Sequence, residues 1–368
     1  MRIIHCSDLH LDSKMTSNLN KDKARERKSE LLNTYLRMID FCRENFVSAV
    51  LIAGDMFDTK SISVKAKNTV RESIINNPEI SFFYLKGNHD SSDEFVSSFE
   101  YIPDNLKLFS DEWRTYELAG GRIKISSVEL SKKNPLALRM MPELDKGAFN
   151  IVMLHGQISG YASKEDAEII DISSLRNKNI DYLALGHIHE YRMDELYPAG
   201  KYCYSGCLEG RGFDECGDHG FVLLDIDEKT ASLKTEFVPF AYRRLYEIKA
   251  DVSGCLTTMQ LLEKIEEALN ISPAKNIDLV KVILRGELDV ECEKNTDLIS
   301  SRLMERYYFA KVYDETKLKL NPQDFALDAS LKGEFVRAVL DANDIAEDFK
   351  AEIIRCGIQA LNGEDIEL

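Results

Sequence analysis

The 368-residue sequence has no apolar run close to the roughly 20 consecutive residues that a membrane-spanning helix needs. Its N-terminus also lacks the basic region, apolar segment and cleavage site of a secretory signal. No Cys-x-x-Cys pair occurs, and the eight cysteines are dispersed along the chain, which is typical of reduced thiols rather than a disulfide framework. These absences predict a cytoplasmic protein that does not act at a membrane.

One subset of the cysteines supports two interpretations. Cys203, Cys207, Cys216 and His219 have a spacing that could hold zinc, or they are small, half-buried residues around a turn. The missing Cys-x-x-Cys pair favours the second interpretation.

A surplus of positive charge is also missing. The chain has 47 basic and 63 acidic side chains and a net charge of −16 at pH 7, which argues against binding nucleic acid by electrostatic attraction alone. The acidity is uneven, because residues 321–368 carry 11 acidic and 4 basic side chains whereas residues 1–50 carry 7 acidic and 9 basic ones. Net acidity therefore does not exclude nucleic acid from the N-terminal part.

Length and apolar content predict two domains and a tail. Residues 1–240 repeat a short apolar run followed by a cluster of Gly, Asp, Asn or His, which is typical of an α/β domain. The apolar runs lie at residues 3–4, 49–53, 82–85, 151–154 and 182–185. The clusters follow their carboxyl ends, where open α/β sheets usually place their sites.

The remaining residues predict a small α/β domain over 241–320 and a helical tail over 321–368. The expected strands are 244–250, 277–287 and 307–313, and the expected helices are 257–269 and 296–305. From about Leu331 onward, apolar residues recur at helical spacing and predict two amphipathic helices. Such stripes serve either internal packing or partner docking, and both interpretations stay open.

Five polar clusters carry the chemistry and use five of the seven histidines. In chain order they are Asp8-Leu9-His10, Gly54-Asp55, Gly87-Asn88-His89-Asp90, His155-Gly156 and Gly186-His187-Ile188-His189. Residues two apart in an extended chain share a side, so the pairs 8 and 10, and 187 and 189, are expected to face one ion or two adjacent ions. Charged and imidazole groups at strand ends are costly to bury unless they are hydrogen-bonded or bind a metal.

Each cluster alone has a plainer interpretation. Asp8 can cap a turn, Asp55 can end a strand, and a lone His155 is more often structural. Their ordered recurrence favours a metal site. Imidazole, carboxylate and amide donors without thiolate suit manganese, iron or zinc better than calcium. More than four donors indicate two ions, which can clamp a phosphate and bridge a hydroxide.

In this order and spacing the clusters resemble the signature of the calcineurin-like metallophosphoesterases over about residues 1–190. The resemblance implies a four-layer α-β-β-α sandwich and two divalent ions, with manganese favoured and iron, zinc or magnesium as alternatives. It also implies seven metal ligands: Asp8, His10, Asp55 and His189 at one ion, with Asp55 bridging, and Asn88, His155 and His187 at the other.

The resemblance further implies in-line attack on phosphorus by a metal-bridging hydroxide. His89 would not be a ligand but would assist departure of the leaving oxygen. Asp58 either orients His89 or caps the helix that follows. His5 and His219 lie outside the matched motifs and receive no role.

Longer matches resemble one branch of this family, the SbcD and YhaO-like DNA repair exonucleases. They cover residues 5–13, 54–58, 87–91, 210–215 and 331–337. This branch implies an exonuclease or endonuclease that cleaves DNA, with a cap at 241–320 that helps to position it. It also implies a tail that docks an SMC-like ATPase of the SbcC type, and often a homodimer.

Two rival functions stay open. One is a phosphodiesterase acting on a nucleotide or other small phosphoester, and the other is a non-catalytic scaffold. The complete ligand set argues against a scaffold. Thr59-Lys60, where the protein phosphatases of the family have Arg-Gly, argues against a phosphoprotein substrate.

Several basic residues near the motifs are candidate DNA contacts. They are Lys21, Lys23, Arg25, Arg27, Lys28, Arg122, Lys124, Lys132, Lys133 and Arg211. The alternative is a solvated helix face, because Asp22 and Glu26 are interspersed among them.

Overall fold

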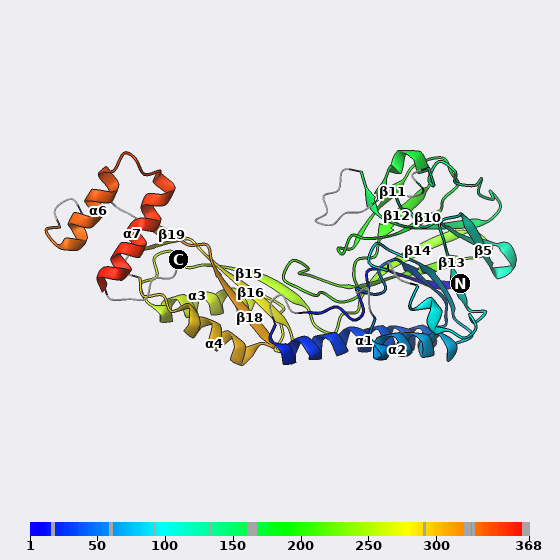
Figure 1. Cartoon of the computed structure of the whole chain (residues 1–368), viewed down its shortest axis with the longest axis horizontal. Helices are drawn as coiled ribbons and strands as arrows, with labels where there is room; N and C mark the ends of the chain where they lie inside the picture. Colours follow the sequence, from blue (N-terminus) through cyan, green and yellow to red (C-terminus); the bar gives the residue numbers. More distant parts are fainter. Residues whose placement is uncertain are drawn as a thin grey trace. The chain divides into compact units, whose positions relative to one another are not determined.

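The computed structural model describes residues 1–15, 19–58, 62–90, 93–132, 134, 136–159, 168–289, 292–319, 325 and 328–362. Thr59, Lys60, Ser91 and Lys133, which the sequence analysis used, lie outside these residues. The chain divides into two compact units, Met1–Arg244 and Leu245–Leu368 (Figure 1). No helix in the described part of the chain is long and apolar enough to cross a bilayer.

Two six-stranded sheets form the first unit. One contains β1 (Arg2–Cys6), β2 (Val47–Ala53), β3 (Ser81–Leu85), β4 (Leu106–Leu108), β13 (Gly220–Asp227) and β14 (Ser232–Pro239), in the order β14-β13-β1-β2-β3-β4. The other contains β5 (Arg114–Leu118), β6 (Ile123–Ser127), β7 (Phe149–His155), β10 (Tyr182–Gly186), β11 (Arg192–Leu196) and β12 (Gly200–Tyr204), in the order β11-β12-β10-β7-β6-β5. Strands β8 (Gln157–Ile158) and β9 (Ile169–Ile170) form a separate pair.

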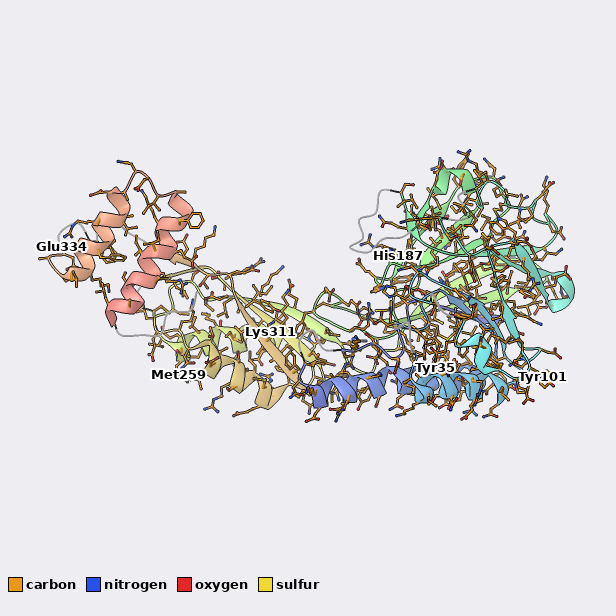
Figure 2. All side chains as sticks on the ribbon, in the orientation of Figure 1. Tyr35, Tyr101, His187, Met259, Lys311 and Glu334 are labelled. Atoms are coloured by element: carbon orange, nitrogen blue, oxygen red, sulfur yellow. The ribbon has the colours of Figure 1, made fainter. Side chains whose placement is uncertain are left out.

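Helices α1 (Lys21–Glu44) and α2 (Val64–Ile75) cover the outer face of the first sheet (Figure 1). Helix α1 begins after Asn20, whose side chain accepts a hydrogen bond from the backbone N–H of Lys23 at 2.9 Å and so satisfies one of the free amide groups of the first turn. Tyr35, labelled in Figure 2, belongs to its buried stripe and lies in the core between the helix and the first sheet. This stripe fixes α1 against the sheet.

The central strands are apolar on both faces because each separates two cores. In β2, Val50 and Ile52 belong to the core beneath the helices, and Leu51 belongs to the core between the sheets. In β7, Ile151 faces the same inter-sheet core and Val152 faces a third core on the outer side of the second sheet. Such strands show continuous apolar runs rather than alternation.

The predicted four-layer α/β class is confirmed, with one difference in detail. In the described residues, the layer outside the second sheet consists of turns and the short 3-10 helix η3 (Ile172–Leu175) rather than a long helix. Two further 3-10 helices, η1 (Val96–Ser98) and η2 (Ala119–Gly121), lie in connections between strands. The five predicted apolar runs fall in β1, β2, β3, β7 and β10, so the polar clusters lie at or just after the carboxyl ends of these strands.

In the second unit, each strand and helix expected after residue 240 overlaps an observed element. Strands β15 (Leu245–Asp251), β16 (Leu279–Arg285) and β18 (Phe309–Asp314) form a parallel sheet in that order, and α3 (Thr258–Ile271) and α4 (Thr296–Arg306) pack on it. Strands β17 (Glu287–Asp289) and β19 (Lys317–Lys319) form a parallel pair. Helices α6 (Leu331–Asp341) and α7 (Glu347–Asn362) share a small apolar core of their own.

Candidate metal centre

The loops after β1 and β2 run side by side and bring the first two polar clusters together. The backbone N–H of Asp8 donates to the Gly54 carbonyl at 3.0 Å, and that of His10 donates to the Asp55 carbonyl at 3.0 Å. Leu11 continues this pairing with the Met56 carbonyl at 2.9 Å. Backbone hydrogen bonds therefore continue the parallel pairing of β1 and β2 into these two loops.

The predicted reason for the pairing of ligands two residues apart is wrong. Asp8, His10 and His187 are not in extended strands but have φ values of 50°, 41° and 101°, and Asp55 has a φ of 52°. Non-glycine residues rarely adopt this left-handed region, and such strain gathers at functional sites. Sharp turns at the strand ends, rather than strand alternation, aim these side chains inward.

The Nε2 atoms of His10 and His189 face each other. His10 Nδ1 lies 3.1 Å from Asp58 Oδ1, and His189 Nδ1 lies 2.7 Å from Glu215 Oε1. Because a carboxylate only accepts, both Nδ1 atoms carry the hydrogen. The two Nε2 atoms are then unprotonated in the neutral rings, yet they lie only 3.2 Å apart. A cation held by these two nitrogens and by Asp8 would satisfy both lone pairs. Asp8 Oδ1 lies 3.9 Å from His189 Nε2.

His155 repeats this arrangement on the other side of Asp55. Its Nδ1 donates to the Ala53 carbonyl at 2.9 Å, which leaves Nε2 facing Asn88 Oδ1 at 2.9 Å and Asp55 Oδ2 at 3.3 Å. Burial opposes the charged form, but the Asp55 carboxylate raises the pKa of His155 to about 9. A divalent ion held by His155 Nε2, Asn88 Oδ1 and Asp55 would take the place of the proton that this raised pKa favours.

Asp55 lies between the two histidine groups. Its Oδ1 accepts from the backbone N–H of His89 at 2.8 Å, whereas its buried Oδ2 accepts no hydrogen bond from the described residues. Besides His155, His10 Nε2 lies 3.9 Å from this oxygen. A buried carboxylate oxygen that accepts no hydrogen bond from the described residues and lies among imidazole nitrogens fits a bridging metal ligand, because burying a charge is costly unless it is paired or binds a metal. The donor set of this centre thus suits divalent ions.

The remaining predicted residues are also brought to this centre. The His187 ring (His187 is labelled in Figure 2) packs edge-on against His155 with centroids 5.6 Å apart, and its backbone N–H donates to Asp8. The ring of His89 packs against His10, and its Nδ1 lies 3.2 Å from Asp58 Oδ1. Asp58 is not the helix cap, because Ser63 caps α2 through the backbone N–H of Ala66.

Sequence reasoning gave no role to two carboxylates that shape the centre. Asp90 accepts the backbone N–H groups of Met56 and Phe57, each at 3.0 Å, and so ties the loop after β2 to the loop after β3. Glu215 orients His189. Burial opposes its ionisation, but His189 and Arg211 hold the pKa of the Glu215 carboxyl well below its usual range. Asp90 belongs to the third polar cluster and Glu215 to the matched segment 210–215, but neither position indicates its partner, which for Glu215 is 26 residues away.

Several candidate DNA contacts have structural partners instead. Arg27 is buried against Glu30 and Glu209, and Lys28 pairs with Asp12 at 2.7 Å. Arg211 pairs with Glu215. Arg122 and Lys124 also pair with carboxylates, at distances of 2.9–3.3 Å. Lys21, Arg25 and Lys132 are exposed, Lys23 is partly exposed, and Lys133 lies outside the described residues.

The zinc alternative is not supported by the arrangement of the cysteines. Among the described residues, the groups of three or more metal-ligating side chains contain no cysteine. Cys207 Sγ instead lies 3.2 Å from His219 Nδ1, and Cys216 donates to the Phe213 carbonyl. The structure records no disulfide among the eight cysteines, all of which lie in the described residues.

Gly54 leaves the space that His155 fills. Its φ is +93°, and an added Cβ would lie 2.1 Å from His155 Nδ1. We expect Gly54→Ala to lower the free energy of unfolding by at least about 2 kcal/mol through backbone strain and overpacking, and to weaken metal binding. Urea unfolding can be followed by fluorescence of the single tryptophan, Trp113, which lies in the first unit.

Gly120→Ala is the matched control for this variant. Gly120 has a φ of +65° but nothing within 4 Å of an added Cβ, so its substitution introduces the strain without the collision. A loss of about 1 kcal/mol is expected there. Equal losses in both variants would show that the contact with His155 contributes nothing.

Comparison of the chain with known proteins identifies its family. The model of the calcineurin-like phosphoesterases matches residues 1–191. The chain is 28% identical over 300 residues to the uncharacterized metallophosphoesterase YhaO of Bacillus subtilis (strain 168), covering 78% of this chain and 72% of YhaO. It is 24% identical over 371 residues to the DNA double-strand break repair protein Mre11 of Sulfolobus acidocaldarius, covering 95% of this chain and 90% of that protein.

A third relative is the SbcD component of the nuclease SbcCD of Escherichia coli (strain K12), 32% identical over 268 residues, with 61% of this chain and 64% of the relative covered. The family match extends over more than half of the chain and contains all five polar clusters. The chain therefore belongs to the calcineurin-like phosphoesterase family and is a metal-dependent phosphoester hydrolase.

Proposed function

We propose that this protein hydrolyses DNA phosphodiester bonds as a manganese-dependent nuclease, of exonuclease or endonuclease type. The observation that carries the hydrolytic part is the set of imidazole Nε2 atoms that face one another beside the buried Asp55 Oδ2, which accepts no hydrogen bond from the described residues, because two divalent ions would satisfy all of them. The likeness to a double-strand break repair protein and to a nuclease component supports DNA as the substrate.

Seven residues would hold two divalent ions. Asp8, His10, Asp55 and His189 would hold one, and Asn88, His155 and His187 would hold the other with Asp55 shared. When bound, such ions supply a nucleophile from water at neutral pH and neutralise charge on the phosphate. Buried carboxylates and left-handed turns keep the ligands in place beforehand, so little reorganisation is needed on binding.

His89 is the proposed proton donor to the leaving sugar oxygen. Its side chain is 27% exposed, more than those of His10 and His155, so it can reach a bound substrate. Asp58 Oδ1 accepts from its Nδ1 at 3.2 Å and thereby directs the other ring nitrogen outward. General acid catalysis requires such an oriented group within reach of the departing oxygen.

The second unit would supply DNA positioning and partner docking. Residues 241–320 are the proposed cap, and residues 321–368 are the proposed docking segment for an SMC-like ATPase of the SbcC type. Exposed apolar side chains on α6 and α7, such as Leu331 and Phe349, support the docking proposal. A homodimer of this chain is part of the same proposal.

The first experiment is cleavage of end-labelled single- and double-stranded DNA by the purified protein with manganese, beside a chromogenic small diester. We expect DNA cleavage that disappears in His89→Ala. Turnover of the small diester without DNA cleavage, also after addition of an SbcC-type ATPase, would favour a small-phosphoester hydrolase. No metal-dependent hydrolysis of either substrate would favour a scaffold.

A further inference from the structure

We propose that Arg211 is a positioning residue that joins two carboxylates, Glu215 and Asp58, into a brace behind three imidazoles of the centre. The brace holds His189 and His10 in the tautomer whose Nε2 is free to bind a metal, and it holds His89 in line with them. The inference rests on the proposed metal centre but not on DNA as the substrate.

The first half of the brace is the contact between Arg211 and Glu215. Two guanidinium nitrogens, Nε and Nη2, donate to Glu215 Oε1 at 3.3 and 2.9 Å, and the backbone N–H of Arg211 donates to Oε2 at 2.7 Å. The same Oε1 accepts from His189 Nδ1 at 2.7 Å. With both oxygens held, the carboxylate cannot rotate away from the ring.

The position of the hydrogen on His189 follows from these contacts. Arg211 Nη2 also lies 3.1 Å from His189 Nδ1, but a guanidinium only donates and the shorter contact of the ring is with a carboxylate. His189 and Arg211 therefore donate to one shared oxygen. This arrangement fixes the hydrogen on Nδ1 and leaves Nε2 facing His10.

The second half of the brace is the ion pair with Asp58. Arg211 Nη1 lies 3.7 Å from Asp58 Oδ1, the oxygen that also lies 3.1 Å from His10 Nδ1 and 3.2 Å from His89 Nδ1. One cation thus lies between the carboxylates that orient a histidine after β1, one after β3 and one after β10. The planar fork of arginine can contact two acceptors in this way, whereas a lysine ammonium acts as a single point charge.

The loop that carries Arg211 is itself anchored. The Glu215 carbonyl lies 2.8 Å from His219 Nε2, and the other nitrogen of that ring lies 3.2 Å from Cys207 Sγ. Arg211 and Glu215 have side chains that are only 17% and 9% exposed, so solvent screens their pairing little. Outer contacts of this kind set ligand orientation, and their loss typically reduces metal affinity by about 10–100-fold.

The test uses the full chain in two states. In the metal-free protein, ring ¹⁵N chemical shifts report the tautomer of each histidine, with His10→Gln and His189→Gln for assignment. Arg211→Met and Arg211→Lys should both shift the His189 signals away from the pure Nδ1–H form. In a calorimetric titration with manganese alone, Arg211→Met should bind about 10–100-fold more weakly than wild type. Arg211→Lys should bind manganese at most somewhat more tightly than Arg211→Met, and still more weakly than wild type.

Arg192→Met is the matched control, because Arg192 also pairs with a glutamate close to His189 but is 42% exposed. Ring shifts and manganese affinity unchanged in both Arg211 variants would overturn the proposal. The lysine variant keeps a positive charge beside Glu215. If the methionine variant does not fold, the ring shifts and the manganese affinity of the lysine variant test the proposal. Wild-type protein that binds no manganese would refute the proposed metal centre, while the metal-free ring shifts would still decide whether the brace exists.

Discussion

Asp55→Asn is expected to lose nearly all hydrolysis and to bind manganese far more weakly than wild type. The carboxylate is buried between His10 and His155, and its Oδ2 has no hydrogen-bond donor among the described residues. Asparagine keeps the shape and the oxygen that accepts from His89, but it removes the charge. The loss of affinity should exceed the about 10–100-fold typical of an outer contact.

Thermal unfolding measures this loss without a substrate. Manganese at a concentration 100 times its Kd should stabilise the wild-type protein by about 2.7 kcal/mol. The same concentration should leave Asp55→Asn nearly unstabilised. A variant stabilised as strongly as wild type would exclude Asp55 from the metal centre.

His89→Ala separates catalysis from binding. The side chain contacts Asp58 and packs on His10, but it is not in the proposed ligand set. Loss of a general acid should lower kcat by about 10²–10⁴-fold, while the stabilisation by manganese stays as in wild type. Full activity in both His89→Ala and Asp55→Asn would refute the whole assignment of roles.

The five apolar runs that the sequence predicts in the first unit fall in strands with a core on each side. β2 and β7 form continuous apolar runs, because their neighbours in the sheet and the layers above and below are all apolar. β14 at a sheet edge alternates between exposed and half-buried residues, and β11 is largely exposed. Such strands are held by antiparallel pairing with β13 and β12, which no run of apolar residues announces.

The candidate site divides in the same way. Asp8, Asp55 and His187 lie within two residues of the carboxyl ends of buried strands, so the sequence pattern is enough to place each of them at a strand end. Glu215 and Arg27 could not be placed, because their partners are distant in sequence. His189 is 26 residues from Glu215, and Glu209 is 182 residues from Arg27. Their roles arise from loops that meet only in the folded sheet.

Arg27 lies in a basic segment that the sequence offers as a DNA contact, but its side chain is buried in ion pairs. Its guanidinium donates to Glu30 Oε2 at 2.6 Å, to Glu209 Oε2 at 3.2 Å and to the Gly210 carbonyl at 2.8 Å. Arg243 also binds Glu30 at 2.7 Å, so Glu30 keeps a cation without Arg27. Among the described residues, Glu209 would then keep neutral donors only, from Thr34 and the backbone of Tyr242.

Arg27→Met should therefore lower the free energy of unfolding by about 3–5 kcal/mol, because it leaves a buried carboxylate without its cation. Urea unfolding followed by Trp113 fluorescence measures the loss in the first unit. Arg25→Met is the control on the same helix. Its side chain is 81% exposed with a loose pair to Asp22, and a change within about 0.5 kcal/mol is expected.

A second variant separates loss of charge pairing from loss of packing. Adding Glu209→Gln to Arg27→Met removes the unpaired charge and should recover much of the lost stability. Replacing both members of a buried ion pair usually changes the free energy of unfolding little. If the double variant is less stable than Arg27→Met alone, the unpaired charge is not the cause. Because Arg27 holds the carbonyl of Gly210, directly before Arg211, the single variant should also weaken manganese binding. The ion pair on α1 would then support the metal centre as well as the fold.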